Sequence, residues 1–312
     1  MKTISILVPC YNEEETINLF YQKIDEVIKK INYNFEILFI NDGSNDNTLY
    51  IMKKLAKQDK RVQYIDLSRN YGKEIAMAAG IDYITGEAMI IIDVDLQDPP
   101  ELIPILIENW EKGYDDVYAQ RVSREGETAL KKLTSKIYYR LLSKLTKIPI
   151  QIDTGDYRLI SKKGIKALRR MRESQRYTKG MFSTIGFKKK SVLYKRNPRI
   201  AGTTKWNYLK LCGLAVDGII SFTIFPLRIS SLLGILISTF SFLYMIFIII
   251  KTIFYGNPVA GYPSLIVIIL FLGGIQLLAL GVIGEYIGRI FNETKKRPLY
   301  FINEYSGKII NK

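Results

Sequence analysis

Histidine is missing from the entire 312-residue sequence. Catalysis by an imidazole base and metal sites built on histidine are therefore excluded. Cysteine is scarce as well: only Cys10 and Cys212 are present, and they form no CxxC pair. Cys10 ends an apolar run, where we expect a buried thiol. The low count indicates no disulfide framework, which is typical of a protein in a reducing compartment.

Acidic residues are outnumbered, with 30 Asp and Glu against 45 Lys and Arg and a formal charge of +15. Such an excess favours anionic partners, which include nucleic acids, lipid surfaces and phosphorylated substrates. The N-terminus lacks the features of a signal peptide, because its apolar run is short and Pro9 and three glutamates follow at once. We expect the N-terminal part to remain in the cytosol.

The first third of the chain alternates short apolar runs with segments of helical periodicity. Strands are predicted over Ile4–Val8, Phe35–Ile40, Val62–Leu67 and Ala88–Ile92. The last of these is almost entirely apolar, as expected for a strand that is covered on both faces. This order predicts a doubly wound, mostly parallel α/β sheet, in which ligands bind at the carboxyl ends of the strands.

Polar clusters follow three of these strands: Tyr11-Asn12-Glu13, Asn41-Asp42-Gly43-Ser44 and Asp93-Val94-Asp95. Tyr11 is suited to stack on a base, and its polar neighbours are suited to bind a base or ribose. Each cluster also has a plain structural interpretation, with Asn12 capping a helix and Asn41–Ser44 forming only a turn.

The Asp93-Val94-Asp95 triplet has the donors of a hard-metal site. If the strand continues, both carboxylates point the same way. They would then suit Mg²⁺ or Mn²⁺ bridging a diphosphate, with Gln97 adding a neutral oxygen. The alternative is that both are loop acids and Asp98 merely caps a helix that begins at Pro99.

Two long uncharged runs occupy the C-terminal third, 229–250 and 264–284, and each is long enough to cross a bilayer. The loop between them has no charge beyond the flanking Lys251, whereas basic residues flank the outer ends, at Arg228, Arg289 and Lys295–Arg297. The positive-inside rule then places both termini in the cytoplasm. The preceding segment, Trp206–Phe225, is predicted either as an amphipathic helix in the membrane interface or as a helix packed on the soluble domain.

The combined motifs resemble family 2 glycosyltransferases in order and spacing, over nearly the whole chain to about Arg289. Within that family, three further motifs resemble the polyprenyl-phosphate glycosyltransferases, which include dolichol-phosphate mannose synthases and bactoprenol glucosyltransferases. These motifs are Leu67–Lys73, Asp153–Leu159 and Gly202–Trp206. A two-helix C-terminal anchor is typical of the bacterial members.

The resemblance implies a GT-A fold and a division into four parts: a cytosolic catalytic domain (1–204), an amphipathic interface helix (205–228), a two-helix transmembrane hairpin (229–288) and a cytosolic basic tail (289–312). It also implies a location in the bacterial cytoplasmic membrane. A homotetramer is known in the family, and nothing in the sequence establishes one here.

The resemblance also implies roles for individual residues. A nucleoside, expected to be uridine, is held by Pro9, Tyr11, Asn12, Glu13, Ile40 and Asp42. The diphosphate is bound near Lys73, Asp93 and Lys205, and the metal by Asp93, Asp95 and Gln97. Candidates for gripping the acceptor phosphate are Arg121, Lys131 and Ser135. Asp156 matches the position proposed as the catalytic base, with orientation of Arg158 or of the acceptor pocket as its alternative role.

The expected reaction is transfer of a hexose, glucose or N-acetylglucosamine, from a UDP-sugar to undecaprenyl phosphate with inversion. Two alternatives remain. A processive polysaccharide synthase would carry a Q-x-x-R-W motif, which Gln175-Arg176-Tyr177 does not fit, and would need more spans. A catalytically silent membrane scaffold would not require both aspartates of the triplet. No recognised nucleic-acid module is present.

Overall fold

The computed structural model describes residues 1–122, 154–196, 225–255 and 261–307. Lys131, Ser135, Lys205 and most of the expected interface helix lie outside these ranges. The described residues up to 196, together with those from 297 on, form one compact unit, and two long helices form a second.

The first unit is built on an eight-stranded sheet with the order β7-β5-β6-β4-β1-β2-β3-β8. Its strands are β1 (Thr3–Cys10), β2 (Asn34–Asn41), β3 (Val62–Leu67), β4 (Ala88–Ile91), β5 (Asp116–Arg121), β6 (Thr154–Ser161), β7 (Lys189–Tyr194) and β8 (Ile302–Tyr305). The central strands β4, β1, β2 and β3 are parallel, while β6 and β8 pair antiparallel to their neighbours. The predicted α/β fold and its four parallel strands are confirmed.

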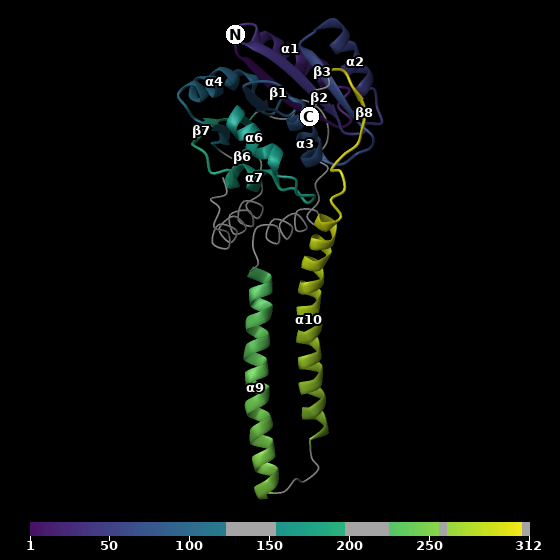
Figure 1. Ribbon diagram of the computed structural model, residues 1–312, viewed down its shortest axis with the longest axis vertical. Coiled ribbons are helices and arrows are strands. Elements are labelled where there is room, and N and C mark those ends of the chain that lie inside the picture. The colour runs from purple at the N-terminus through teal and green to yellow at the C-terminus, as the bar shows by residue number, and fades with distance from the viewer. Residues whose placement is uncertain (123–153, 197–224, 256–260, 308–312) are drawn as a thin grey trace. The chain divides into compact units, whose positions relative to one another are not determined.

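Helices cover both faces of the sheet (Figure 1). One face packs against α1 (Ile17–Ile28), α2 (Thr48–Gln58) and α4 (Ile103–Glu111), and the 3-10 helix η1 (Pro100–Leu102) precedes α4. The other face packs against α3 (Lys73–Tyr83), α6 (Lys162–Arg170) and α7 (Thr178–Thr184). The strands are therefore buried from both sides, which explains why β4 contains only apolar residues.

The last strand was not anticipated. The sequence predicts only a basic tail after residue 288, whereas residues 302–305 pair antiparallel with β3 and form the edge of the sheet. The strand has four residues, and its partner lies more than 230 residues earlier in the chain. No local hydrophobic periodicity predicts the pairing of so short a strand with β3. In sequence, the two long helices are thus inserted between parts of the same compact unit.

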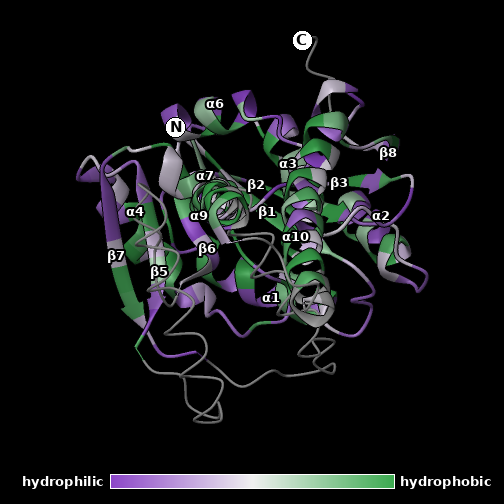
Figure 2. Ribbon diagram, turned by 90° about the horizontal axis from the view of Figure 1, so that it is seen from below, coloured by the Kyte–Doolittle hydropathy of each residue, from purple (hydrophilic) through white to green (hydrophobic). Residues whose placement is uncertain are grey.

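The second unit consists of α9 (Phe225–Tyr255) and α10 (Tyr262–Thr294), which contact each other. Both helices are long and apolar enough to cross a membrane, over Phe225–Tyr255 and Phe271–Thr294. Hydrophobic residues predominate on α9 in Figure 2, and most of its large apolar side chains are exposed. Both helices extend past the predicted spans, so Arg228 lies within the first turns of α9 and Arg289 near the end of α10.

Candidate functional site

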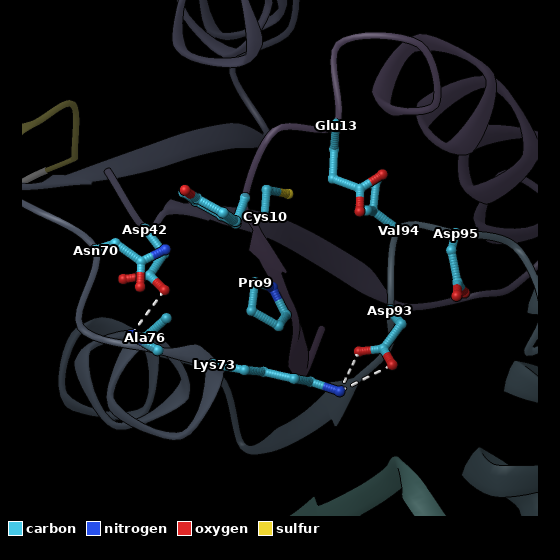
Figure 3. A pocket seen from close by; sticks show the side chains of 12 residues that line it. Pro9, Cys10, Glu13, Asp42, Asn70, Lys73, Ala76, Asp93, Val94 and Asp95 are labelled. Carbon is cyan, nitrogen blue, oxygen red and sulfur yellow. Dashed lines mark hydrogen bonds and ion pairs between the residues drawn. The ribbon is translucent and has the colours of Figure 1, made fainter. Parts of the chain in front are cut away.

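A cavity of about 320 Å³ opens at the carboxyl ends of the parallel strands. It brings together side chains from all three of the polar clusters that follow β1, β2 and β4 (Figure 3). The residues that line it are Pro9, Cys10, Tyr11, Glu13, Asp42, Asn70, Gly72, Lys73, Ala76, Asp93, Val94 and Asp95. Ile40, which was expected to contact the nucleoside, lies in the core beneath the cavity and is fully buried.

The loop after β1 is held against the loop after β2. The backbone N–H of Asn12 donates to Ser44 Oγ at 2.9 Å, and Asn12 Oδ1 accepts from the N–H of Asn45 at 2.8 Å. Asn12 has a left-handed backbone with φ of 53°, and α1 is capped at Thr16 instead. The helix-capping interpretation of Asn12 is therefore wrong, and Asn12 instead fixes the loop that carries Tyr11 and Glu13.

Asp42 holds the loop that follows β3. Its two carboxylate oxygens accept from the N–H groups of Tyr71 at 2.7 Å and Gly72 at 2.9 Å. Burial raises the pKa of Asp42, and the two backbone donors oppose this by favouring the ionised form. The loop packs so closely that a Cβ on Gly43, whose φ is +64°, would lie 2.4 Å from the backbone of Arg69. Glycine is thus required at position 43.

Lys73 is the cation of the cavity. Its Nζ lies 2.7 Å from Asp93 Oδ1 and 2.6 Å from Asp156 Oδ2, so it joins the loop after β4 to strand β6. Figure 3 shows Lys73 directed at the Asp93 carboxylate. The charges of Asp156 and Asp93 raise the pKa of Lys73.

The two aspartates of the triplet do not follow strand alternation. Strand β4 ends at Ile91 and the chain turns at Val94, with Leu96 in a left-handed conformation (φ 54°). Asp93 contacts Lys73, whereas Asp95 is almost buried and its Oδ1 accepts from the N–H of Gln97 at 3.2 Å. Both still line the same cavity. Two carboxylates on one cavity are hard oxygen donors, and this donor set fits Mg²⁺ or Mn²⁺.

Asp98 belongs to a second polar cluster beside the cavity. It accepts a hydrogen bond from Tyr194 Oη and lies 3.8 Å from Arg196 Nε. Arg121, a predicted acceptor-phosphate ligand, donates to the same Tyr194 oxygen at 3.3 Å. The helix that follows is capped by Pro99, so the capping interpretation of Asp98 is wrong.

Asp156 is kept ionised by its neighbour. Although burial opposes ionisation, Lys73 lowers the pKa of Asp156 to about 2. Its Oδ1 is buried and has no hydrogen-bond partner among the described residues. Arg158 does not need Asp156 for its orientation, since its guanidinium bonds to Asp116 and to the carbonyl oxygen of Gly155.

Glu74 was not singled out from the sequence. It follows Lys73 in the first turn of α3, and its Oε2 accepts from the N–H of Thr178 at 2.9 Å. Burial, followed by the charge of Asp156, raises the pKa of Glu74 to about 7. Its position next to Lys73 at a helix start is the only sequence signal that could have drawn attention to it.

A second cavity of about 450 Å³ adjoins the first and shares Tyr11 and Asn70 with it. Its walls are the loops that follow β2 and β3, together with Asn303 from β8. The C-terminal strand therefore contributes a side chain next to the predicted donor site.

The chain is similar in sequence and in fold to known proteins. Residues 5–169 match the family model described as glycosyl transferase family 2. The prophage bactoprenol glucosyl transferase homolog of Escherichia coli (strain K12) is 48% identical over 96% of this chain and 98% of its own length. The bactoprenol glucosyl transferase of Shigella phage SfX is 47% identical over the same shares. The crystal structure of mannosyl-3-phosphoglycerate synthase from Rubrobacter xylanophilus covers 70% of this chain and 73% of its own, with a TM-score of 0.50 and 16% identity, which shows the shared fold alone.

Proposed function

The chain belongs to glycosyl transferase family 2, and we propose that it transfers glucose from UDP-glucose to undecaprenyl phosphate, the bactoprenol carrier. The observation that carries this proposal is the full-length identity of 47–48% to bactoprenol glucosyl transferases, which extends over the two apolar helices. The paired aspartates of the main cavity support an active enzyme over a silent scaffold.

The donor is proposed to lie along the main cavity. Tyr11 and Glu13, from the loop after β1, would face the nucleoside, and Lys73 and Asp93 would lie near the diphosphate. Asp42 acts indirectly, because its carboxylate is occupied by the loop that carries Asn70. Asp93 and Asp95 would hold Mg²⁺ or Mn²⁺, which when bound would neutralise charge that develops on the leaving diphosphate.

The acceptor needs little activation. A phosphate monoester has a second pKa of about 6 and is largely dianionic near neutral pH. Its oxygen attacks the anomeric carbon, the bond from that carbon to the diphosphate oxygen breaks, and UDP leaves with the bonding electrons. Attack opposite the leaving group inverts the anomeric centre, and no proton has to be removed from the nucleophile.

Asp156 is therefore proposed to anchor Lys73 and not to act as a base. A carboxylate with a pKa of about 2 is a weak proton acceptor at neutral pH. Its charge instead keeps Lys73 at the position where negative charge builds up on the leaving group.

The basic flanks of the apolar helices support a cytoplasmic location for both ends of the chain. The catalytic unit would then work at the cytoplasmic face of the membrane, where nucleotide-sugars are present. The acceptor phosphate would be gripped by Arg121 together with Lys131 and Ser135, and Lys205 would approach the donor.

The test uses the full chain in detergent with undecaprenyl phosphate, Mg²⁺ and radiolabelled UDP-glucose or UDP-N-acetylglucosamine. We expect labelled lipid from UDP-glucose, and a loss of about 10²–10³-fold in rate for Asp95→Ala. Glu108→Ala, which removes an exposed carboxylate on α4, serves as the control. Transfer of N-acetylglucosamine alone would correct the sugar, and no transfer from either donor by folded protein would contradict the function.

A further inference from the structure

We propose that the C-terminal strand β8 is part of the donor site, and that Asn303 is a positioning residue for the loops that bind the nucleoside diphosphate. The inference rests on the proposed function, because it extends the same site to a segment that follows the second long helix in sequence.

Strand β8 is attached to the end of β3, where the loop of the donor cavity begins. The N–H of Ser68 donates to the carbonyl of Phe301 at 3.0 Å, and Tyr64 and Ser306 bond to each other through three contacts. Ser68 and the two residues that follow it line the second cavity, and Asn70 lines both. The strand thus holds the start of this loop.

The register singles out Asn303. Asp66 pairs with Glu304 and Leu67 pairs with Ile302, so that Asn303 is skipped as the extra residue of a β-bulge. A β-bulge changes the direction of a side chain and leaves one residue without a partner in the backbone pairing. Here the side chain lies against Asp66, to which Asn303 Nδ2 donates at 3.2 Å.

Asp66 links Asn303 to the loop that follows β2. The carboxylate is nearly buried, and its second oxygen accepts from Asn41 Nδ2 at 2.7 Å. Asn41 Oδ1 in turn accepts from the N–H of Ser44 at 3.2 Å, and Ser44 Oγ accepts from the N–H of Asn12 at 2.9 Å. One continuous chain of hydrogen bonds therefore runs from β8 to the loop that carries Tyr11.

A buried carboxylate depends on its donors, because a lost hydrogen bond to a charged buried group is costly. Without Asn303, Asp66 keeps only Asn41 among these two side-chain donors, and the loops after β1 and β2 lose their link to β8. A strand that served only to cover the sheet edge would stabilise the fold without altering nucleotide affinity. The two roles are separable by measuring binding and stability on the same variants.

The experiment measures binding of UDP to the full chain in detergent with Mn²⁺, by calorimetry, alongside the melting temperature. Asn303→Asp places a second carboxylate against Asp66, and we expect the Kd for UDP to rise about tenfold, the scale of one lost hydrogen bond to a charged group. Combining it with Asp66→Asn restores the pair with its polarity exchanged, since the amide at position 66 donates to position 303 and still accepts from Asn41. We expect the double variant to recover most of the affinity.

Glu304→Ala is the matched control. Glu304 ties β8 to Lys53 and to Tyr64 Oη and takes no part in the chain of hydrogen bonds through Asp66. It should lower the melting temperature and leave the Kd unchanged. Additive effects in the double variant, or an Asn303→Asp variant that loses stability but binds UDP as the wild type does, would overturn the proposal while leaving the function intact. A wild-type chain that binds no UDP would overturn the donor assignment and this inference with it.

Discussion

Two ion pairs lie on strand β6, two residues apart and on the same face of the sheet, and they differ in one respect. Asp156 pairs with Lys73, whose side chain is 41% exposed and lines the cavity. Arg158 pairs with Asp116 and is fully buried, with its guanidinium 3.9 Å above the ring of Phe182. Lys73 of the first pair borders the cavity, whereas the second pair is covered in the core.

The two ion pairs of β6 differ in their access to the cavity. Asp156 and Arg158 belong to one sequence motif, and the sequence does not show which of their partners borders the cavity. Access to the cavity separates them: a cation that ligands can reach is able to take part in binding, whereas a covered one can only stabilise. Each variant below tests that division.

The largest expected effect is on the buried pair. Arg158→Met leaves Asp116 buried without its main partner, which costs about 3–5 kcal/mol. For a unit of this size the melting temperature should fall by about 10 °C, measured by intrinsic fluorescence of the full chain in detergent. Lys162→Met, which removes an exposed partner of Glu87, should change the stability by less than about 1 kcal/mol. If Arg158→Met lowered the melting temperature no more than Lys162→Met does, the buried ion pair would not stabilise the fold as proposed.

The second prediction concerns the open pair. Lys73→Met should reduce kcat/KM for glucosyl transfer by about 10²-fold, because a cation near the leaving diphosphate is lost. It should also lower the melting temperature, though by less than Arg158→Met does, because Asp156 loses the cation that keeps it ionised. Asp156→Asn should cost about tenfold and keep the wild-type pH profile, since Asp156 anchors Lys73 in this proposal. An acidic limb that disappears from the rate profile in Asp156→Asn would instead identify Asp156 as the base.

The sequence predicted the location of the site better than the roles of its residues. The clusters after β1, β2 and β4 do meet in one cavity, because parallel strands bring their carboxyl ends to one edge. Asp42 and Asn12 were expected to bind ligand, whereas backbone groups of neighbouring loops occupy them. Residue type and order cannot show which side chains the protein itself uses.

The contributions that were missed come from contacts distant in sequence. Tyr194 meets Asp98 across 96 residues, and Asn303 meets Asp66 across 237. The strand-alternation argument for Asp93 and Asp95 was wrong for a local reason, since β4 ends at Ile91 and the backbone at Leu96 is left-handed. Neither the distant pairings nor this turn has a pattern that a single sequence displays.

The smallest expected effect concerns Glu74, a largely buried carboxyl group next to Lys73 in sequence. Its pKa is raised to about 7 by burial and by Asp156, while Lys73, Arg176 and the N–H of Thr178 oppose the rise. In the unfolded chain a glutamate titrates near 4.3. Between these values the folded state holds more protons than the unfolded state, so stability falls as the pH rises from about 4 to 7.

Glu74→Gln keeps the acceptor for Thr178 and removes the titration. The chain has no histidine to titrate in this range, so the difference between wild type and variant isolates Glu74. Between pH 5 and pH 8 the stability of the variant relative to the wild type should rise by roughly 2.5 kcal/mol, since each pKa unit corresponds to about 1.4 kcal/mol. Melting temperatures at several pH values provide the measurement. If the melting temperatures of both proteins changed with pH in the same way, the pKa of Glu74 would not differ between the folded and unfolded states. Glu74 would then be ionised in the folded protein at neutral pH, as Asp156 is.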